Sequence, residues 1–336
     1  MPIPIKADPE FTRHMVDAGY LARDPFVFVD VGAAGGFRSK FDVFGPSLMK
    51  IGFEPDTDGY ETLNEQPNER IFQKALGNAN ETRPLYLTRS PFSHSMLKSN
   101  SVFWKRMWSN TVQQEVGQTN VDMVRFDDLS KTESIGDVDY MKIDTESTEL
   151  EILRGAETAL RESVIAVECE VAFYLVHHER CLFADVDYFL RELGFSLYAL
   201  ETVNLPRRVT PTQYLTNGSD YNPDNPGAYP KADFGHIIGG DALYIADFQD
   251  GCNSAKFDSL PKLLKTAGVF DIHNLPDCAL ELIESGVTNN IIPDEVLAHS
   301  DRLFTRKHSD LYEDIRKAGR HFVPSFMKPL LRRVVP

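Results

Sequence analysis

Residues 26–36 read FVFVDVGAAGG, a short and almost wholly apolar run that ends in a cluster of glycines. A continuous run of β-branched and aromatic residues is typical of a strand buried on both faces, as in a parallel sheet. The glycines that follow indicate a tight turn. Similar runs alternate with helical patterns along the chain, which predicts a doubly wound α/β sheet with strands at 26–31, 49–53, 71–76, 138–143, 164–171, 195–200 and 242–245.

Apolar residues at helical spacing predict helices between and after these strands. One such pattern covers residues 146–160, and three more follow residue 247, at 260–267, 275–285 and 293–317. We expect an N-terminal helical segment at 1–24, a main domain at 25–248 and a C-terminal helical extension with a basic tail at 249–336.

The predicted strands 195–200 and 242–245 are joined by a long connection without helical periodicity. Inside a compact domain, such a connection is usually a functional loop or a disordered excursion. It carries two adjacent arginines, Arg207 and Arg208, and several tyrosines, including Tyr214. Because its tyrosines favour a binding role, we interpret residues 202–240 as a lid over a substrate.

The chain is acidic, with 35 Lys and Arg against 50 Asp and Glu and a formal net charge of −15. The excess of acid lies in the first 250 residues, since residues 251–336 carry 12 basic and 11 acidic side chains. Nucleic-acid binding draws on many Lys and Arg contacts with phosphates, so we expect no nucleic-acid partner. No acid follows Asp314, and the basic tail either packs on the acidic body or makes weak contact with a membrane surface or an anionic partner.

The sequence has the character of a cytoplasmic protein. Its N-terminus lacks the continuous apolar core of a signal peptide, and no stretch approaches the roughly 18 apolar residues of a membrane span. Its four cysteines have no paired short spacing, so they indicate neither a disulfide framework nor a zinc site. We therefore expect a reducing compartment and no transmembrane segment.

The glycine turn indicates a cofactor site, because glycines let a ligand approach and let backbone amides face it. Alignment of the dinucleotide fingerprint Gly-x-Gly-x-x-Gly places Asp30 at the first glycine, where a carboxylate would repel a pyrophosphate but would suit a cationic ligand. The second predicted strand leads into Glu54, in a position where a carboxylate accepts both hydroxyls of a ribose. A nucleoside with a free ribose, a positive charge and no phosphate is S-adenosylmethionine, which we expect as the cofactor.

Further motifs follow in order along the chain: FEP at 53–55, ALG at 75–77, SHS at 93–95, RFDDL at 125–129, MKIDTE at 141–146, the strand with Glu168 and Glu170, and GDAL at 240–243. With DVGAAGG at 30–36, this set resembles the FkbM-type S-adenosylmethionine-dependent methyltransferases over residues 25–248. The resemblance implies a Rossmann-like seven-stranded sheet whose last strand is antiparallel. It also implies O-methylation, often of sugars or natural products.

To the cofactor site we assign Asp30, Gly32, Ala33, Gly36, Glu54, Pro55, Ala75 and Leu76. One departure from the family concerns the turn after the fourth strand. The family usually has Gly and Ala after its Ile-Asp-x-Glu/Gln motif, whereas this sequence has Ser147 and Thr148. A serine in place of a glycine adds bulk where a substrate or cofactor approaches this helix start.

O-methylation requires a hydroxyl in line with the sulfonium methyl and removal of its proton, to which a general base adds roughly 10²- to 10⁴-fold. Carboxylates at the carboxyl ends of the fourth and fifth strands, and a histidine between two serines, are suited to this role. The candidates for catalysis are Asp144, Glu146, Glu168 and His94. Glu170 shares a face of the fifth strand with Glu168, and we assign it to substrate binding with Arg207, Arg208 and Tyr214. The two arginines suit a sugar face or the phosphate of a nucleotide sugar.

Each candidate has a structural alternative. For Glu168 and Glu170 it is pairing with a buried Lys or Arg such as Lys142. For His94, a lone histidine in a loop, it is a surface position without a role. The run His177-His178-Glu179 resembles a metal cluster only superficially, because neighbouring helical residues point about 100° apart. Spacing gives no support to a magnesium site at Asp144 and Glu168, so we expect no metal.

The sequence thus predicts an S-adenosylmethionine-dependent O-methyltransferase that acts on a hydroxyl of a carbohydrate or a glycosylated metabolite. One alternative keeps the cofactor and changes the acceptor to an amine or to a peptide, lipid or polyketide hydroxyl. An alternative of another class is a binding or scaffold module that keeps the nucleoside pocket without turnover.

Overall fold

The computed structural model describes residues 3–63, 65–108, 112–215, 234–249, 251–253 and 255–304. Seven strands form the main sheet in the order β3-β2-β1-β7-β8-β10-β9. The central strand β1 pairs with β2 and β7, and all six of its residues are buried, as its apolar sequence requires. The strands are β1 (Phe26–Val31), β2 (Leu48–Phe53), β3 (Glu69–Phe72), β7 (Tyr140–Ile143), β8 (Ala166–Ala172), β9 (Phe195–Leu205) and β10 (His236–Ala246).

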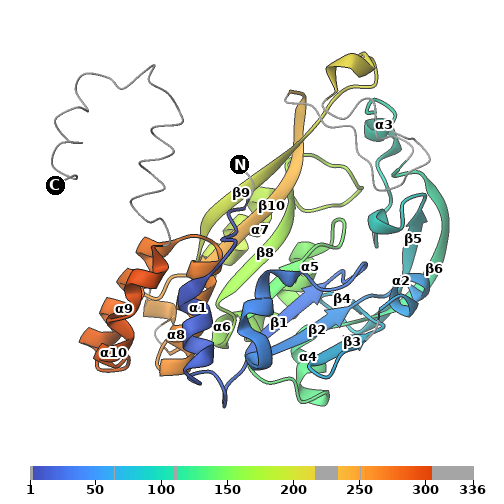
Figure 1. Cartoon of the computed structure of the whole chain (residues 1–336). Coiled ribbons are helices and arrows are strands. Elements are labelled where there is room, and N and C mark those ends of the chain that lie inside the picture. The colour runs from blue at the N-terminus through green and yellow to red at the C-terminus, as the bar shows by residue number, and fades with distance from the viewer. Residues whose placement is uncertain are drawn as a thin grey trace, which may run out of the picture.

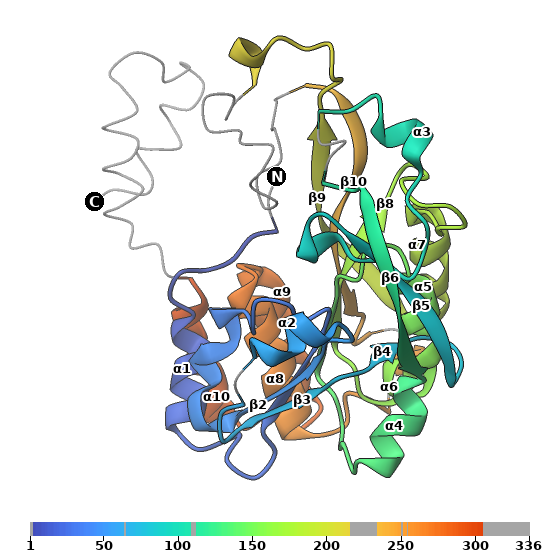
Figure 2. The ribbon, with the colours of Figure 1, turned by 90° about the vertical axis from the view of Figure 1, so that its right-hand side faces the viewer.

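The last strand, β10, runs antiparallel to both of its neighbours, whereas the pairs among the other central strands are parallel. The predicted doubly wound sheet with an antiparallel last strand is therefore confirmed (Figure 1). Figure 2 shows helices on both sides of it, α1, α8 and α9 on one and α4 to α7 on the other. Their bounds are α1 (Glu10–Asp17), α4 (Phe126–Thr132), α5 (Glu149–Gly155), α6 (Glu157–Glu162), α7 (Phe183–Glu192), α8 (Leu260–Ile272) and α9 (Pro276–Thr288).

A second, three-stranded sheet lies beside the first, in the order β4-β6-β5. It consists of β4 (Ala75–Leu76), β5 (Glu81–Thr88) and β6 (Glu115–Val124), and the short helices α2 (Thr57–Glu61) and α3 (Ser101–Trp104) flank this region. The single strand expected at 71–76 is wrong, because β3 ends at Phe72 and β4 belongs to the other sheet. Strand β6 was not predicted, because most of its residues are exposed and polar and form no apolar run.

The helix expected over 146–160 is also wrong. Glu146 and Ser147 have φ angles of +55° and +117°, which no α-helix accommodates, and α5 begins only at Glu149. A second break at Ala156, with φ −112°, separates α5 from α6. The chain therefore makes a tight turn directly after β7, where a helix start was expected.

The two ends of the expected lid belong to strands. β9 continues to Leu205 and pairs with β10 from His236 onward. Between them, Tyr214 ends a 3₁₀ turn (Thr212–Tyr214) and is 60% exposed. Residues 216–233 lie outside the described part of the chain, so the lid stays a prediction.

The C-terminal helices pack on the sheet domain. One hydrophobic cluster contains Phe11 of α1, Phe28 of β1 and Phe270 of α8. Lys262 and Lys265 of α8 hold the buried Asp139, just before β7, at 2.6 and 3.0 Å. The chain continues through α10 (Asp294–Leu297) and a 3₁₀ turn (Ser300–Leu303) instead of the helix expected at 293–317, as far as it is described.

The basic tail, at 305–336, lies outside the described residues, and the expected domain boundaries near 25 and 249 stay predictions. None of the described helices has the length and apolar character that a membrane span requires.

Candidate functional site

A cavity of about 340 Å³ lies where β1, β2 and β7 end. This is the edge at which doubly wound folds bind ligands. Ten of the residues selected from the sequence line it: Asp30, Gly32, Gly36, Glu54, Pro55, Ala75, Leu76, His94, Asp144 and Glu146. Its described lining does not include Ala33, Glu168, Glu170, Arg207, Arg208 or Tyr214.

The turn after β1 brings two strand ends close together. Gly32 has φ +84°, and a Cβ there would lie 2.1 Å from the carbonyl oxygen of Asp144, so only glycine fits. The amides of Gly32 and Ala33 both donate to the carbonyl of Phe53, at 3.0 Å each. These two amides therefore close the turn onto β2, and the expectation that the turn's amides face the ligand is wrong for them.

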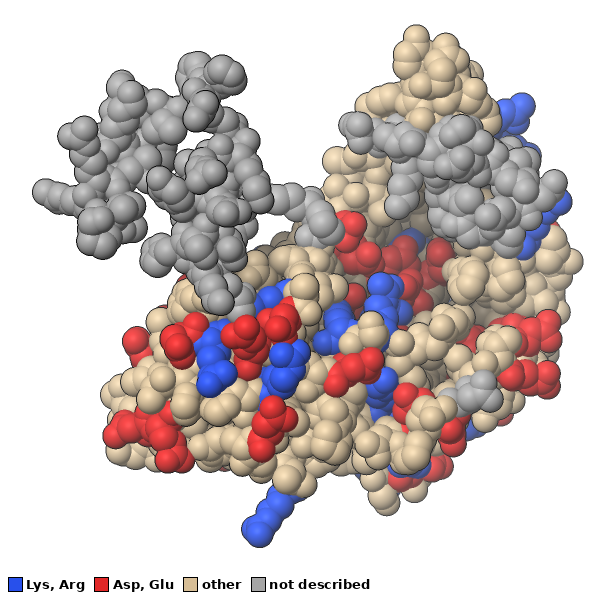
Figure 3. All heavy atoms as spheres, viewed as in Figure 1, with Lys and Arg blue, Asp and Glu red and all other residues tan. Residues whose placement is uncertain are grey.

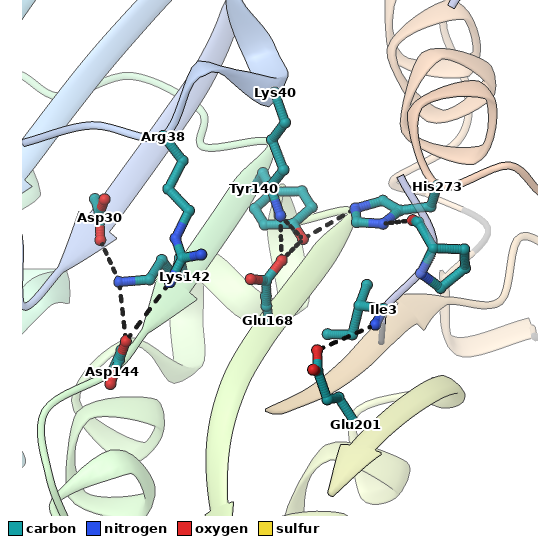
Figure 4. Close-up of polar contacts among 11 residues, drawn as sticks. Ile3, Asp30, Arg38, Lys40, Tyr140, Lys142, Asp144, Glu168, Glu201 and His273 are labelled. Carbon is teal, nitrogen blue, oxygen red and sulfur yellow. Dashed lines mark hydrogen bonds and ion pairs between the residues drawn. The ribbon is translucent and has the colours of Figure 1, made fainter. Parts of the chain in front are cut away.

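A chain of alternating charges forms one wall of the cavity (Figure 4). Lys142 lies 3.0 Å from Asp30 and 3.4 Å from Asp144, and Arg38 lies 4.0 Å from Asp144. Burial raises the pKa of Asp30 although Lys142 opposes the shift. Asp30 thus already has a cation partner, and the Asp144 side chain, 38% exposed, is the more accessible carboxylate.

Glu54 is buried at the end of β2, with 6% of its surface exposed. Its carboxylate accepts hydrogen bonds from the amides of Asp56, at 3.0 Å, and Ala34. Burial nevertheless raises the pKa of Glu54 to about 7. A carboxylate has about four acceptor positions, so two remain for the two hydroxyls of a ribose. The residues present therefore fit the nucleoside that the sequence predicts.

The turn that carries Glu146 is held from several sides. Ser95 Oγ donates to the Glu146 carbonyl at 2.6 Å, and the Gln113 side chain hydrogen-bonds the carboxyl group. Burial raises the pKa of Glu146 to about 8, against the attraction of Arg180. The carboxyl group is therefore mostly protonated at neutral pH.

His94 presents a donor to the cavity. Its Nδ1 accepts a hydrogen bond from the Thr88 amide at 3.1 Å, and burial lowers its pKa. Neutral His94 therefore carries its proton on Nε2, which suits the donation of a hydrogen bond better than the removal of a proton.

Glu168 lies in a buried network away from the cavity lining. It pairs with Lys40 and accepts a hydrogen bond from Tyr140 Oη at 2.7 Å. Burial favours protonation of Glu168, but Lys40 and Tyr140 together hold its pKa below the ordinary value. His273, directly after α8, joins the network through Tyr140, whose Oη lies 3.1 Å from its Nε2 (Figure 4). The expected structural pairing exists, but its partner is Lys40 and not Lys142.

Glu170 and Arg207, both assigned to substrate binding, have different partners. Glu170 faces Arg180 at 3.2 Å, and burial raises its pKa well above the ordinary value. Arg207 contacts His236 at 3.2 Å near the ends of β9 and β10. Arg208 is exposed beside it, so the structure gives these residues no common site with Glu170.

Sequence reasoning missed Arg38 and Asp241. Arg38 lies in the loop after the first strand, where a doubly wound fold binds its ligand, and that position was the available signal. Asp241 lies in the GDAL motif, and its pKa is raised to about 6 by burial and then by the charges of Asp144 and Glu168. Figure 3 shows this side of the molecule hollowed near its centre, with acidic side chains gathered inside and basic ones beside them.

A metal cluster is absent from the described residues, where no group of three or more His, Cys, Asp or Glu side chains has the required geometry. Within the run His177-His178-Glu179, His177 is buried and its Nδ1 lies 2.5 Å from Ser147 Oγ. His177 therefore stabilises the turn after β7 through this hydrogen bond.

The strand order and the cavity define a Rossmann-like fold with a ligand cavity at the carboxyl ends of its strands. The family model described as "Methyltransferase FkbM domain" matches residues 30–197. The chain belongs to this family of S-adenosylmethionine-dependent methyltransferases, and S-adenosylmethionine is its cofactor. A comparison with curated proteins found no match.

Several solved structures are similar to this chain at low identity. A methyltransferase FkbM from Methylobacillus flagellatus KT is 14% identical with a TM-score of 0.33, and the alignment covers 66% of this chain and 44% of that one. The chain thus spans less than half the length of that protein. The magnesium protoporphyrin IX methyltransferase from Synechocystis PCC 6803 with bound S-adenosylmethionine is 8% identical, with a TM-score of 0.29 and coverage of 70% and 80%. A putative RNA methyltransferase from Pyrococcus horikoshii is 11% identical, with a TM-score of 0.29 and coverage of 72% and 82%.

Proposed function

We propose that this protein transfers the methyl group of S-adenosylmethionine to a hydroxyl of a carbohydrate or a glycosylated metabolite, in the cytoplasm, with residues 25–248 as the catalytic unit. The observation that carries the proposal is the composition of one cavity. It combines the buried Glu54, which has two open acceptor positions, with Asp144 and Glu146 after β7. Carboxylates accept hydrogen bonds from sugar hydroxyls, and this end of the sheet is rich in them.

The residues divide between the cofactor and the acceptor. S-adenosylmethionine supplies a methyl group on a cationic sulfur. Glu54 binds the ribose, and Asp30 with Gly32 and Gly36 shapes the neighbouring wall. The closed turn at Ala33 fixes this wall without contacting the ligand. Pro55, Ala75 and Leu76 add apolar surface for the adenine.

The acceptor hydroxyl must lose a proton to one of the carboxylates at the end of β7. Asp144 is accessible and lies between Lys142 and Arg38, which also attract the acceptor oxygen as negative charge develops on it. Glu146 accepts the proton only in its ionised form, which is populated above about pH 8. His94 orients the acceptor by donating from Nε2.

The direct test is transfer of labelled methyl from S-adenosylmethionine to fractionated cell extract, followed by mass spectrometry of the labelled species. We expect the label in a carbohydrate fraction, and Asp144→Asn to lower the rate by at least about 100-fold. Thr57→Ala, in the exposed part of α2, is the matched control and should leave the rate unchanged. Label found only in protein, lipid or amine fractions would replace the carbohydrate with that acceptor. No transfer at all, with cofactor binding intact, would favour a binding module.

A further inference from the structure

A second cavity, of about 480 Å³, lies beside α3. We call it the α3 cavity, and the lining residues that matter here are Lys98, Ser99, Lys105, Gln113, Glu115 and His178. None of them lines the cofactor cavity. The function derived above therefore gives this cavity no role.

The α3 cavity has a surplus of positive and hydrogen-bond-donating groups. Lys98, Lys105 and His178 are exposed, and neither lysine forms an ion pair with another residue in the described part of the chain. Lys98 Nζ lies 5.6 Å from the centre of the Tyr86 ring, which orients it without neutralising it. Glu115 is the lining acid, and one of its oxygens already accepts from the Ser99 amide at 2.9 Å.

The end of β9 lies beside α3. The Arg208 amide donates to the Arg106 carbonyl at 2.9 Å, and Arg207 pairs with Met107. Both contacts fall directly after Lys105, so Arg207 and Arg208 lie next to α3. Figure 2 shows α3 beside the ends of β9 and β10.

Two polar atoms on residues that line the α3 cavity lack a partner. Ser99 Oγ and Gln113 Oε1 are buried and form no hydrogen bond with any described residue. Gln113 is only 3% exposed. A buried amide oxygen without a partner is destabilising, so a ligand hydroxyl that reached it after a small side-chain movement would be favoured.

Two links connect the α3 cavity with the cofactor cavity. His94 and Met96 line the cofactor cavity, and Lys98 and Ser99 line the α3 cavity. Four residues of chain span no more than about 14 Å, so His94 and Lys98 are no farther apart than that. Gln113 provides a second link, since its side chain lines the α3 cavity and hydrogen-bonds Glu146 of the cofactor cavity.

We propose that the α3 cavity binds the anionic part of an oligosaccharide acceptor whose hydroxyl reaches the cofactor cavity, which makes the acceptor a glycan with a carboxylate, phosphate or sulfate group. This inference rests on the proposed function for its acceptor. Lys98, Lys105 and His178 hold the anionic group, and sugar hydroxyls pair with Ser99 and Gln113.

The test is calorimetric titration of the full chain with trigalacturonate, which carries carboxylates, and with maltotriose, its neutral counterpart. We expect saturable binding of trigalacturonate and at least tenfold weaker binding of maltotriose. The double variant Lys98→Gln/Lys105→Gln should bind trigalacturonate about tenfold more weakly, since each exposed charge contributes about threefold. Glu115→Gln should bind it more tightly, because the opposing acid is gone.

Lys131→Gln, an exposed lysine on α4, is the matched control and should bind like the unaltered protein. No binding of trigalacturonate, or equal binding by the double variant, would overturn the proposal. Displacement of trigalacturonate by an equal concentration of inorganic phosphate would show a site for a small anion and overturn the glycan assignment. Transfer of labelled methyl to fractionated extract is measured separately. Label in a carbohydrate fraction without trigalacturonate binding would overturn the α3 assignment alone, whereas label only in other fractions would overturn the proposed function.

Discussion

The affinity for S-adenosylmethionine should depend on pH through Glu54. Burial raises the pKa of this carboxyl group to about 7, so it is mostly protonated below neutral pH. The ribose hydroxyls donate to an ionised carboxylate more strongly than to a protonated one. Below neutral pH, cofactor binding should therefore release a proton from Glu54. The affinity for the cofactor should fall as the pH falls through 7.

The size of the effect follows from the fraction of Glu54 that is ionised. With a pKa of about 7, ionisation falls from roughly 90% at pH 8 to roughly 3% at pH 5.5. If only the ionised form binds, the dissociation constant rises about 30-fold between these pH values, equivalent to about 2 kcal/mol. Glu54→Gln removes the titrating group, so the variant should lose most of this pH dependence. At pH 8 it should bind at least about tenfold more weakly, because a hydrogen bond to a charged group is lost.

Isothermal titration with S-adenosylmethionine and with its demethylated product, from pH 5.5 to 8, measures the dependence. Glu61→Gln, an exposed acid on α2, is the control for the loss of one negative charge and should retain the 30-fold change. A dissociation constant that is flat across this range would refute the assignment of Glu54 to the ribose. So would a Glu54→Gln variant with the full pH dependence.

Three further outcomes follow from the turns at the cavity. Ser147→Ala keeps φ at +117° but loses the hydrogen bond to His177, so it should lower the unfolding free energy by about 1–3 kcal/mol. Ser147→Gly relieves the strained backbone and should be about 1–2 kcal/mol more stable than Ser147→Ala in urea titrations. Equal urea midpoints for the two variants would count against backbone strain at this position. Gly32→Ala puts a methyl group 2.1 Å from the carbonyl oxygen of Asp144, so the variant should show neither a cooperative thermal unfolding transition nor cofactor binding. An unchanged melting temperature or an unchanged dissociation constant would contradict this contact. If Glu146 is the general base, kcat/KM rises with pH up to about 8, and Glu146→Gln abolishes that rise. A rise that persists in the variant would show that another group accepts the proton.

The parts of the site that sequence predicted are those encoded by local patterns. The apolar run before the glycine turn identified β1, and the distance from Asp30 to the end of the next strand identified Glu54. Both signals depend on residues close together in the chain and on the regular geometry of a doubly wound sheet. Gly32 belongs to the same class, since a tight turn at a strand end needs a residue that adopts positive φ.

The partners of the charged residues could not be predicted in the same way. Asp30 meets Lys142 because β1 and β7 are adjacent and in register, although 112 residues separate them in the chain. Glu168 meets Lys40 across 128 residues. A single sequence shows that a buried acid needs a partner, but which cation supplies it depends on strand order and register. The ion pair of Glu168 is therefore a tertiary property.

The turn at Ser147 joins the family pattern to the chemistry of the cavity. Sequence comparison raised the concern that a serine in a glycine position would add bulk beside the ligand. Ser147 is 2% exposed, its hydroxyl lies 2.5 Å from His177, and it is not among the residues that line the cavity. Its side chain is therefore directed into the protein, and the hydrogen bond to His177 offsets part of the cost of a φ of +117°. Because the turn keeps the glycine-like backbone with a serine in place, Glu146 still reaches the cavity, and the substitution gives no reason to assign the protein a purely binding role.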